Sequence, residues 1–164
     1  MDTSATEMQP RRDGAVLSMA LKLIRRHRDL TAAQVATALP MPLRTYERFE
    51  AGEIRLNIDY IHRFALATDS DPYAILMAIA VGSPKLALRC ADNKLMTTLT
   101  VGVQRLDRAL GDRVRTLDGR AIVEAVCALT DQLAAESAAQ QRAADWLDRG
   151  VSDLAAVRPK PGRG

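Results

Sequence analysis

The sequence is poor in aromatic residues, cysteine, glycine and proline. Aromatics make up 4% of the 164 residues, and there are two cysteines, nine glycines and seven prolines. Few aromatics and few turn residues argue against a β-sandwich or a barrel. Two cysteines exclude a disulfide framework and a four-cysteine zinc site. Since there are only two histidines, His27 and His62, a mixed zinc site would need all four residues to converge.

The sequence also shows no pattern typical of a signal peptide or of a membrane-spanning segment. The first ten residues lack the charged and then apolar run of a signal peptide. The longest mostly apolar run, Tyr73 to Gly82, is far too short for a membrane span. We therefore expect no membrane contact and a cytoplasmic protein whose thiols are reduced.

What the chain does contain is enough apolar and charged sequence for a folded core. It is 48% hydrophobic and 26% charged, with a formal net charge of +3. Between Arg11 and Arg63 there are ten Lys/Arg and six Asp/Glu, so the excess positive charge lies in the first third. A mildly basic chain permits nucleic-acid binding without proving it.

Hydrophobic periodicity predicts helices almost throughout, and so an all-α fold. Pro, Gly and capping residues divide residues 15–81 into five short helices, at about 15–27, 32–39, 42–51, 58–68 and 72–81. The side chains that we expect to point inward are Val16, Met19, Ala20, Leu23, Ile24, Val35, Ala36, Leu39, Met41, Tyr46, Phe49, Tyr60, Ile61, Phe64, Ala65, Leu66, Ile75, Leu76 and Ile79. We expect Cys90 and Cys127 to be buried as small hydrophobes, and His27 and His62 to lie on the surface or in packing contacts.

The second and third of these helices are joined by a three-residue turn, which is the spacing of a helix-turn-helix. The stretch 30–36, Leu-Thr-Ala-Ala-Gln-Val-Ala, and the stretch 45–52, Thr-Tyr-Glu-Arg-Phe-Glu-Ala-Gly, resemble the λ-repressor/Cro (XRE-type) family of DNA-binding domains. The resemblance also includes Leu23-Ile24-Arg25 and Phe64-Ala65, and it covers about 40% of the chain. It implies a five-helix domain over residues 14–82 and a bacterial or phage regulator associated with the nucleoid.

The resemblance implies that the third helix enters the major groove of DNA, where its first residues face base edges. Arg44 and Arg48 share one helix face and suit guanine, while Leu43 and Thr45 suit a thymine methyl. Glu47 is expected either to accept a hydrogen bond from the amino group of cytosine or to orient Arg48. The candidate phosphate contacts are Arg55, Arg25, Arg26 and Arg28. The pattern departs from the family at Pro40, Pro42, Ala32 and Leu43, and we interpret Glu50 as a structural ion pair or cap.

The rest of the chain predicts a helical region over 83–157, between a flexible tail at 1–13 and a basic one at 158–164. A helix over about 83–92 comes first. Two narrow apolar stripes follow, Leu95, Leu99, Val103, Leu106 and Leu110, and then Ile122, Val126, Leu129 and Leu133. They favour a helical hairpin that either dimerises, binds another protein or completes one core.

We therefore predict a sequence-specific regulator of transcription that binds double-stranded DNA as a homodimer. It needs no metal or cofactor, and no catalytic constellation predicts an enzyme. A second interpretation is an interaction module with a degenerate helix-turn-helix, whose C-terminal helices bind RNA polymerase, a sigma factor or a toxin. A third, a ligand-sensing repressor, has no convergent polar set to support it.

Overall fold

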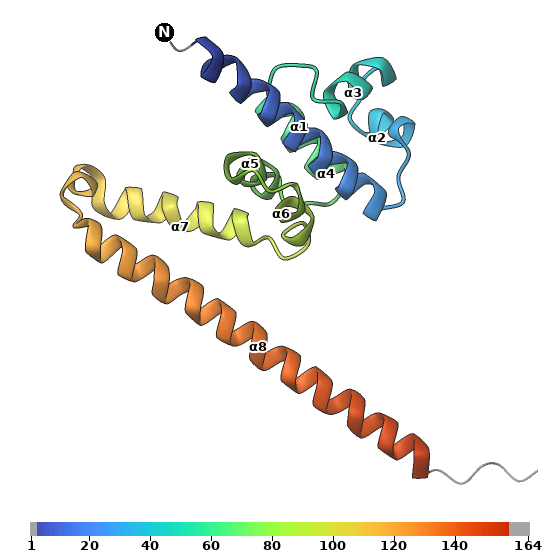
Figure 1. Cartoon of the computed structure of the whole chain (residues 1–164), viewed down its shortest axis with the longest axis vertical. Helices are drawn as coiled ribbons and strands as arrows, with labels where there is room; N and C mark the ends of the chain where they lie inside the picture. The colour runs from blue at the N-terminus through green and yellow to red at the C-terminus, as the bar shows by residue number, and fades with distance from the viewer. Residues whose placement is uncertain (1–2, 158–164) are drawn as a thin grey trace, which may run out of the picture. The chain divides into compact units, whose positions relative to one another are not determined.

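The protein is all-helical over the residues that its computed structural model describes (Figure 1). These are residues 3–157 for the backbone and residues 12–152 for the side chains. No strand occurs among them, which confirms the predicted all-α class. The chain divides into two compact units, one up to Ala109 and one from Leu110.

Nine helical segments follow one another over residues 3–157. They are α1 (Thr3–His27), α2 (Ala32–Ala38), α3 (Leu43–Glu50), α4 (Ile58–Ala67), α5 (Pro72–Val81), α6 (Pro84–Arg89), α7 (Leu95–Leu110), the short 3₁₀ helix η1 (Gly111–Thr116) and α8 (Gly119–Val157). The predicted helices agree with these bounds to within a few residues, except at the start of α1. Residues 1–13 were expected to form a tail because they lack apolar periodicity, yet the helix already begins at Thr3. The predicted tail at 158–164 lies outside the described residues.

The core of the first unit lies where α1 packs against α3, α5 and α6, and where α4 packs against α2 and α5. Its largest fully buried side chains include Tyr46, Phe49 and Phe64. Tyr46 and Phe49 lie edge to face, with ring centroids 6.4 Å apart. Each fully buried side chain of this size contributes about 1.5–3 kcal/mol. This core therefore holds α3 in place from beneath.

Side-chain caps set the helix starts that the sequence predicts. The Thr31 hydroxyl accepts from the Gln34 amide at 3.2 Å, and the Gln34 side chain accepts from the Thr31 amide at 2.8 Å. Asn57 and Asp71 cap α4 and α5 in the same way. Gly82 ends α5 in the left-handed conformation, with φ +69°. Such caps satisfy backbone groups that a helix terminus leaves unpaired.

Asp71 also attaches α7 to the first unit. Its buried carboxylate accepts from the Thr97 amide at 2.9 Å and from the Thr97 hydroxyl at 2.7 Å, while it caps α5. One carboxylate thus serves the N-termini of two helices. The first turn of α7 is therefore fixed to α5, although the later residues 101–109 are exposed.

Some predicted inward positions are wrong. Met19 is 57% exposed and Leu66 is 86% exposed. In α1 the buried face runs through Leu17, Leu21 and Ile24, because α5 and α6 cover that face, and Met19 lies more than a third of a turn away from it. Cys90 is buried as expected, but Cys127 is exposed, because no helix in the described part of its unit packs over α8.

The second unit consists of η1 and α8. Apart from the half-buried Gly150, every described α8 residue from 120 to 152 is exposed. Ile122, Val126, Leu129 and Leu133 form the predicted stripe, and each is 42–55% exposed. The contacts divide the chain after Ala109, whereas the sequence places a boundary after residue 82, because α6 packs on α1 and α5. No helix in the described part of the chain is both long and apolar enough to span a membrane.

Candidate nucleic-acid interface

The helices α2 and α3 form a tightly connected pair. The Leu39 amide donates to the Val35 carbonyl at 2.9 Å, and the Met41 amide donates to the Ala36 carbonyl at 3.0 Å. The Pro42 carbonyl then accepts the first bonds of α3. Proline suits this position because it has no amide hydrogen to leave unpaired. The sequence correctly predicts both helices and the short turn between them.

α3 has a buried face and an exposed face. Tyr46, Phe49 and Glu50 are buried, and Thr45 is half-buried. The exposed face is formed by Leu43, Arg44, Glu47 and Arg48, four of the five α3 residues that the sequence singled out. Since Leu43 is 43% exposed, an apolar side chain stands beside two guanidinium groups on one surface.

A partly buried ion-pair network fixes α3 to α1. Arg25 donates to both oxygens of Glu50, from Nε at 2.6 Å and from Nη2 at 3.0 Å. The Tyr46 hydroxyl donates to Glu50 Oε1 at 2.7 Å. The hydrogen bond with Glu50 raises the pKa of Arg25, and burial raises the pKa of Tyr46. Hydrogen bonds between charged groups are stronger than neutral ones, so the network restricts how α3 rotates.

Arg25 is therefore occupied within the fold rather than free for a phosphate. Its third nitrogen, Nη1, donates to the Leu30 carbonyl at 3.0 Å. The interpretation of Glu50 as a structural ion pair is confirmed. The sequence does not reveal this contact, because Arg25 and Glu50 lie 25 residues apart and meet only in the folded chain.

A close contact between two glycines brings the end of α3 against α1. Gly52 has φ +72°, and a Cβ placed on it would lie 2.1 Å from the Gly14 carbonyl oxygen. A Cβ on Gly14 would lie 2.7 Å from the Gly52 carbonyl oxygen. Only glycine fits at both positions, since any side chain would force the backbones apart. The predicted stop at Gly52 thus also determines where α3 ends relative to α1.

Three cations remain on and after α3. Arg44 has no ion pair among the described residues. Arg48 lies 3.6 Å from Glu53, with both side chains exposed, so this pair is weak and easily exchanged. Arg55 is exposed in the connection between α3 and α4. The sequence did not single out Glu53, whose proximity to Arg48 depends on the turn after α3.

The two other predicted phosphate contacts lie elsewhere. Arg28 donates to the Thr68 and Asp69 carbonyls, each at 2.8 Å, and pairs with Asp92. The bond from Arg28 holds the pKa of Asp92 below its usual range. Arg26 is exposed and lines a hollow between α1 and the α5–α6 connection. The structure therefore groups Arg44, Thr45, Arg48, Leu43 and Glu47 on α3, with Arg55 in the connection that follows, but not Arg25, Arg26 or Arg28.

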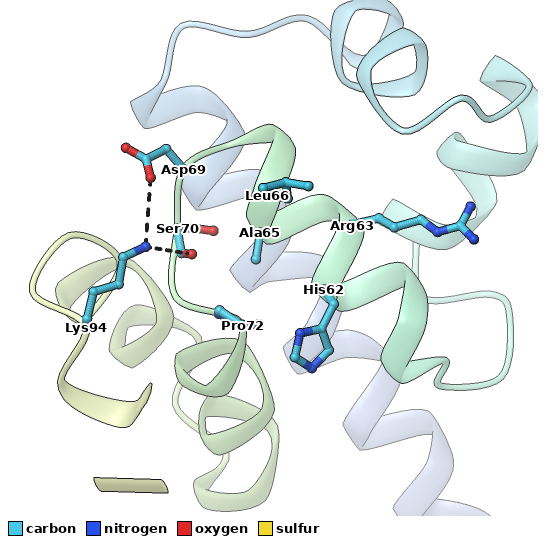
Figure 2. A pocket seen from close by; sticks show the side chains of 8 residues that line it. All are labelled: His62, Arg63, Ala65, Leu66, Asp69, Ser70, Pro72 and Lys94. Atoms are coloured by element: carbon cyan, nitrogen blue, oxygen red, sulfur yellow. Dashed lines mark hydrogen bonds and ion pairs between the residues drawn. The ribbon is translucent and has the colours of Figure 1, made fainter. Parts of the chain in front are cut away.

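A second group of polar side chains lines a hollow of about 440 Å³ beside α4 (Figure 2). They are His62, Arg63, Asp69, Ser70 and Lys94. Lys94 donates to the Ser70 carbonyl at 3.1 Å and lies 3.8 Å from Asp69. His62 is exposed and packs edge-on against Tyr73, with ring centroids 5.6 Å apart. Arg63, which also lines the hollow, pairs with Asp59 at 2.9 Å. The residues that line the hollow place no nucleophile next to a base.

No family model, curated protein or solved structure matches this chain. Within residues 12–152, no group of three or more His, Cys, Asp or Glu side chains is placed to hold a metal ion. The exposed face of α3 and the network that orients it are therefore the candidate functional site.

Proposed function

We propose that this protein is a sequence-specific DNA-binding regulator of transcription of the λ-repressor/Cro-like (XRE) type. α3 lies in the major groove of double-stranded DNA. Arg44 and Arg48 contact base edges, Thr45 and Leu43 contact thymine methyl groups, and Glu47 accepts from cytosine or orients Arg48. Arg55 binds a backbone phosphate beside the groove.

The observation that carries the proposal is the two-faced geometry of α3. A helix that reads DNA must be held firmly from behind while it presents cationic and small apolar side chains outward. Here Tyr46, Phe49 and the Arg25–Glu50 pair hold the inner face. The outer face carries two arginines, and the exposed carboxylates next to them in sequence are Glu47 and Glu53, since Glu50 is buried against Arg25.

The proposal includes a homodimer formed through the C-terminal helices. α8 exposes an apolar stripe along one face, and burial of such a stripe against a second helix is favourable. Two copies present two α3 helices to half-sites about one DNA turn apart. Dimerisation thus supplies the contacts that one short helix lacks.

The test is selection of bound duplexes from a random-sequence DNA library by the full chain, followed by binding measurements on the selected site. We expect a short palindrome and an affinity that falls steeply with salt. The R44A/R48A variant should lose at least about tenfold selectivity between the selected site and a scrambled one, since each guanine contact contributes about 1–3 kcal/mol.

The matched control is R105A/R108A, which removes two exposed arginines of α7. It should keep the site preference while it weakens binding slightly through net charge. Both double variants should fold normally, because surface substitutions change stability by about 0.5 kcal/mol or less. Full site preference in R44A/R48A would contradict the assignment of α3.

The second candidate function is an interaction module with a degenerate helix-turn-helix. The exposed apolar residues on α7 and α8, such as Val103 and Leu106 with the α8 stripe, favour it because they suit a protein surface. It predicts a stoichiometric protein partner, such as RNA polymerase or a toxin, and no retention on DNA at low salt. Site-selective DNA binding would reject this alternative.

A further inference from the structure

A second cationic surface lies on the other side of α1 from α3. It surrounds a hollow of about 400 Å³ between α1 and the connection from α5 to α6. The hollow is lined by Met19, Lys22, Leu23 and Arg26 of α1, and by Gly82, Ser83, Pro84 and Lys85. In Figure 1, α2 and α3 lie along one side of α1, while α5 and α6 lie along the opposite side.

The cations of this hollow are not neutralised. Lys22, Arg26 and Lys85 form no ion pair among the described residues, and no carboxylate lines the hollow. Arg12 lies against its edge, because a Cβ on Gly82 would be 2.9 Å from Arg12 Nη2. The hollow beside α4 differs, since its Lys94 is already paired with Asp69. Uncompensated charge of one sign attracts a partner of the opposite sign.

The wall between these cations is apolar. Met19 is exposed, and Leu23 and Pro84 are half-buried. Methionine is flexible and adapts to partners of different shape. The phosphate backbone of DNA offers nothing that would cover an apolar wall, whereas an acidic protein segment with one apolar side chain matches both features. The hollow therefore favours a protein partner over nucleic acid.

The location of the hollow agrees with that choice. This step rests on the proposed function, in which α3 occupies DNA. Because α1 separates the hollow from α3, a duplex that binds α3 leaves the Lys22–Lys85 side uncovered. A DNA-bound copy can then bind a second macromolecule at the same time.

We propose that this hollow is a docking site for an acidic segment of a partner protein. Carboxylates of the segment pair with Lys22, Arg26 and Lys85, and an apolar side chain between them packs against Met19, Leu23 and Pro84. Pairs of this exposed kind are individually weak, so the apolar contact and the three cations act together.

The experiment uses the full chain to select binders from a displayed library of random 12-residue peptides. Selected peptides are then measured against the wild type, against K22E/R26E/K85E and against the control R105E/R108E/R115E, which reverses three exposed arginines of α7 and η1. We expect clones with two or more Asp/Glu around one large apolar residue. They should lose at least about tenfold in affinity for the hollow variant, and little for the control.

Three outcomes would overturn the proposal. These are clones without acidic residues, equal loss in the two charge-reversal variants, or retained peptide binding in the hollow variant. Circular dichroism and thermal unfolding establish that both variants fold. DNA binding is measured in parallel: if only the hollow variant loses DNA affinity and peptides are unaffected, the hollow contacts the DNA backbone instead. A failure of R44A/R48A to alter site preference would reject the DNA proposal separately, without changing the peptide result.

Discussion

The two units of this chain are both helical, but they differ in what the apolar residues of their helices contact. In the first unit, α1 to α6 bury their apolar faces against one another around Ile24, Phe49 and Phe64. In the second unit, the stripe on α8 stays exposed, because η1 is the only other helical segment described there. A periodic apolar stripe therefore indicates that a helix packs against another apolar surface. The local sequence does not show whether that surface belongs to the same chain or to another one.

The largest expected effect concerns the ion pair inside the first unit. Arg25→Leu leaves the Glu50 carboxylate buried and uncompensated, so the free energy of unfolding should fall by about 3–5 kcal/mol. Urea unfolding of the full chain measures it. The neighbouring substitution Arg26→Leu serves as control and should change stability by about 0.5 kcal/mol or less.

A second variant separates the ion pair from simple packing. R25L/E50L removes both charges and should recover much of the loss seen in R25L, because no unpaired charge remains. If R25L alone is as stable as the wild type, the network does not hold α3, and the contrast between the two units is weaker than the structure indicates.

In the second unit we expect a substitution to change the oligomeric state strongly and the stability only slightly. L129S/L133S interrupts the α8 stripe, so the protein should change from dimer to monomer in sedimentation velocity at several concentrations. Unfolding of the first unit should change by about 0.5 kcal/mol or less. The matched control A128S/A135S places two serines on the opposite face of α8 and should leave the dimer intact. A wild type that is monomeric at every concentration would contradict the dimer.

The smallest expected effect is a pH dependence at Asp92. Since Arg28 lowers the pKa of this carboxyl, the contact stabilises the fold above the ordinary value of about 3.9 and is lost as the pH falls through the lowered folded value. Carboxyl NMR titration of the full chain should place the Asp92 midpoint below its ordinary value. In Arg28→Gln the midpoint should rise, and in Arg26→Gln it should not move. Equal midpoints in the wild type and Arg28→Gln would show that another group lowers it.

Much of the first unit can be predicted from the sequence because its signals are local. Thr31, Asn57 and Asp71 mark helix starts through side chains that cap the next two or three amides, so a single sequence reveals them. The same locality explains why the α2–α3 pair is predicted closely. Met19 and Leu66 are predicted wrongly because the choice of buried face depends on which helices arrive from elsewhere in the chain.

The candidate site also has a part that the sequence predicts and a part that it does not. The exposed cations Arg44 and Arg48 follow from their spacing on one short helix. The different surroundings of Arg25 and Arg26 do not: Arg25 pairs with Glu50, whereas Arg26 is exposed at a hollow that Lys85 also lines. Glu50 and Lys85 are both far from these arginines in sequence, so no local pattern distinguishes a structural arginine from an exposed one.

By itself, the sequence determined that this chain is helical, where its short helices begin, and that α3 carries arginines four residues apart. Only the tertiary structure decided that Arg25 is bound to Glu50, that Gly14 and Gly52 meet, and that Lys22, Arg26 and Lys85 surround one hollow. The physical reason is range: capping and periodicity act over a few residues, whereas burial and charge pairing depend on segments that meet only when the chain has folded.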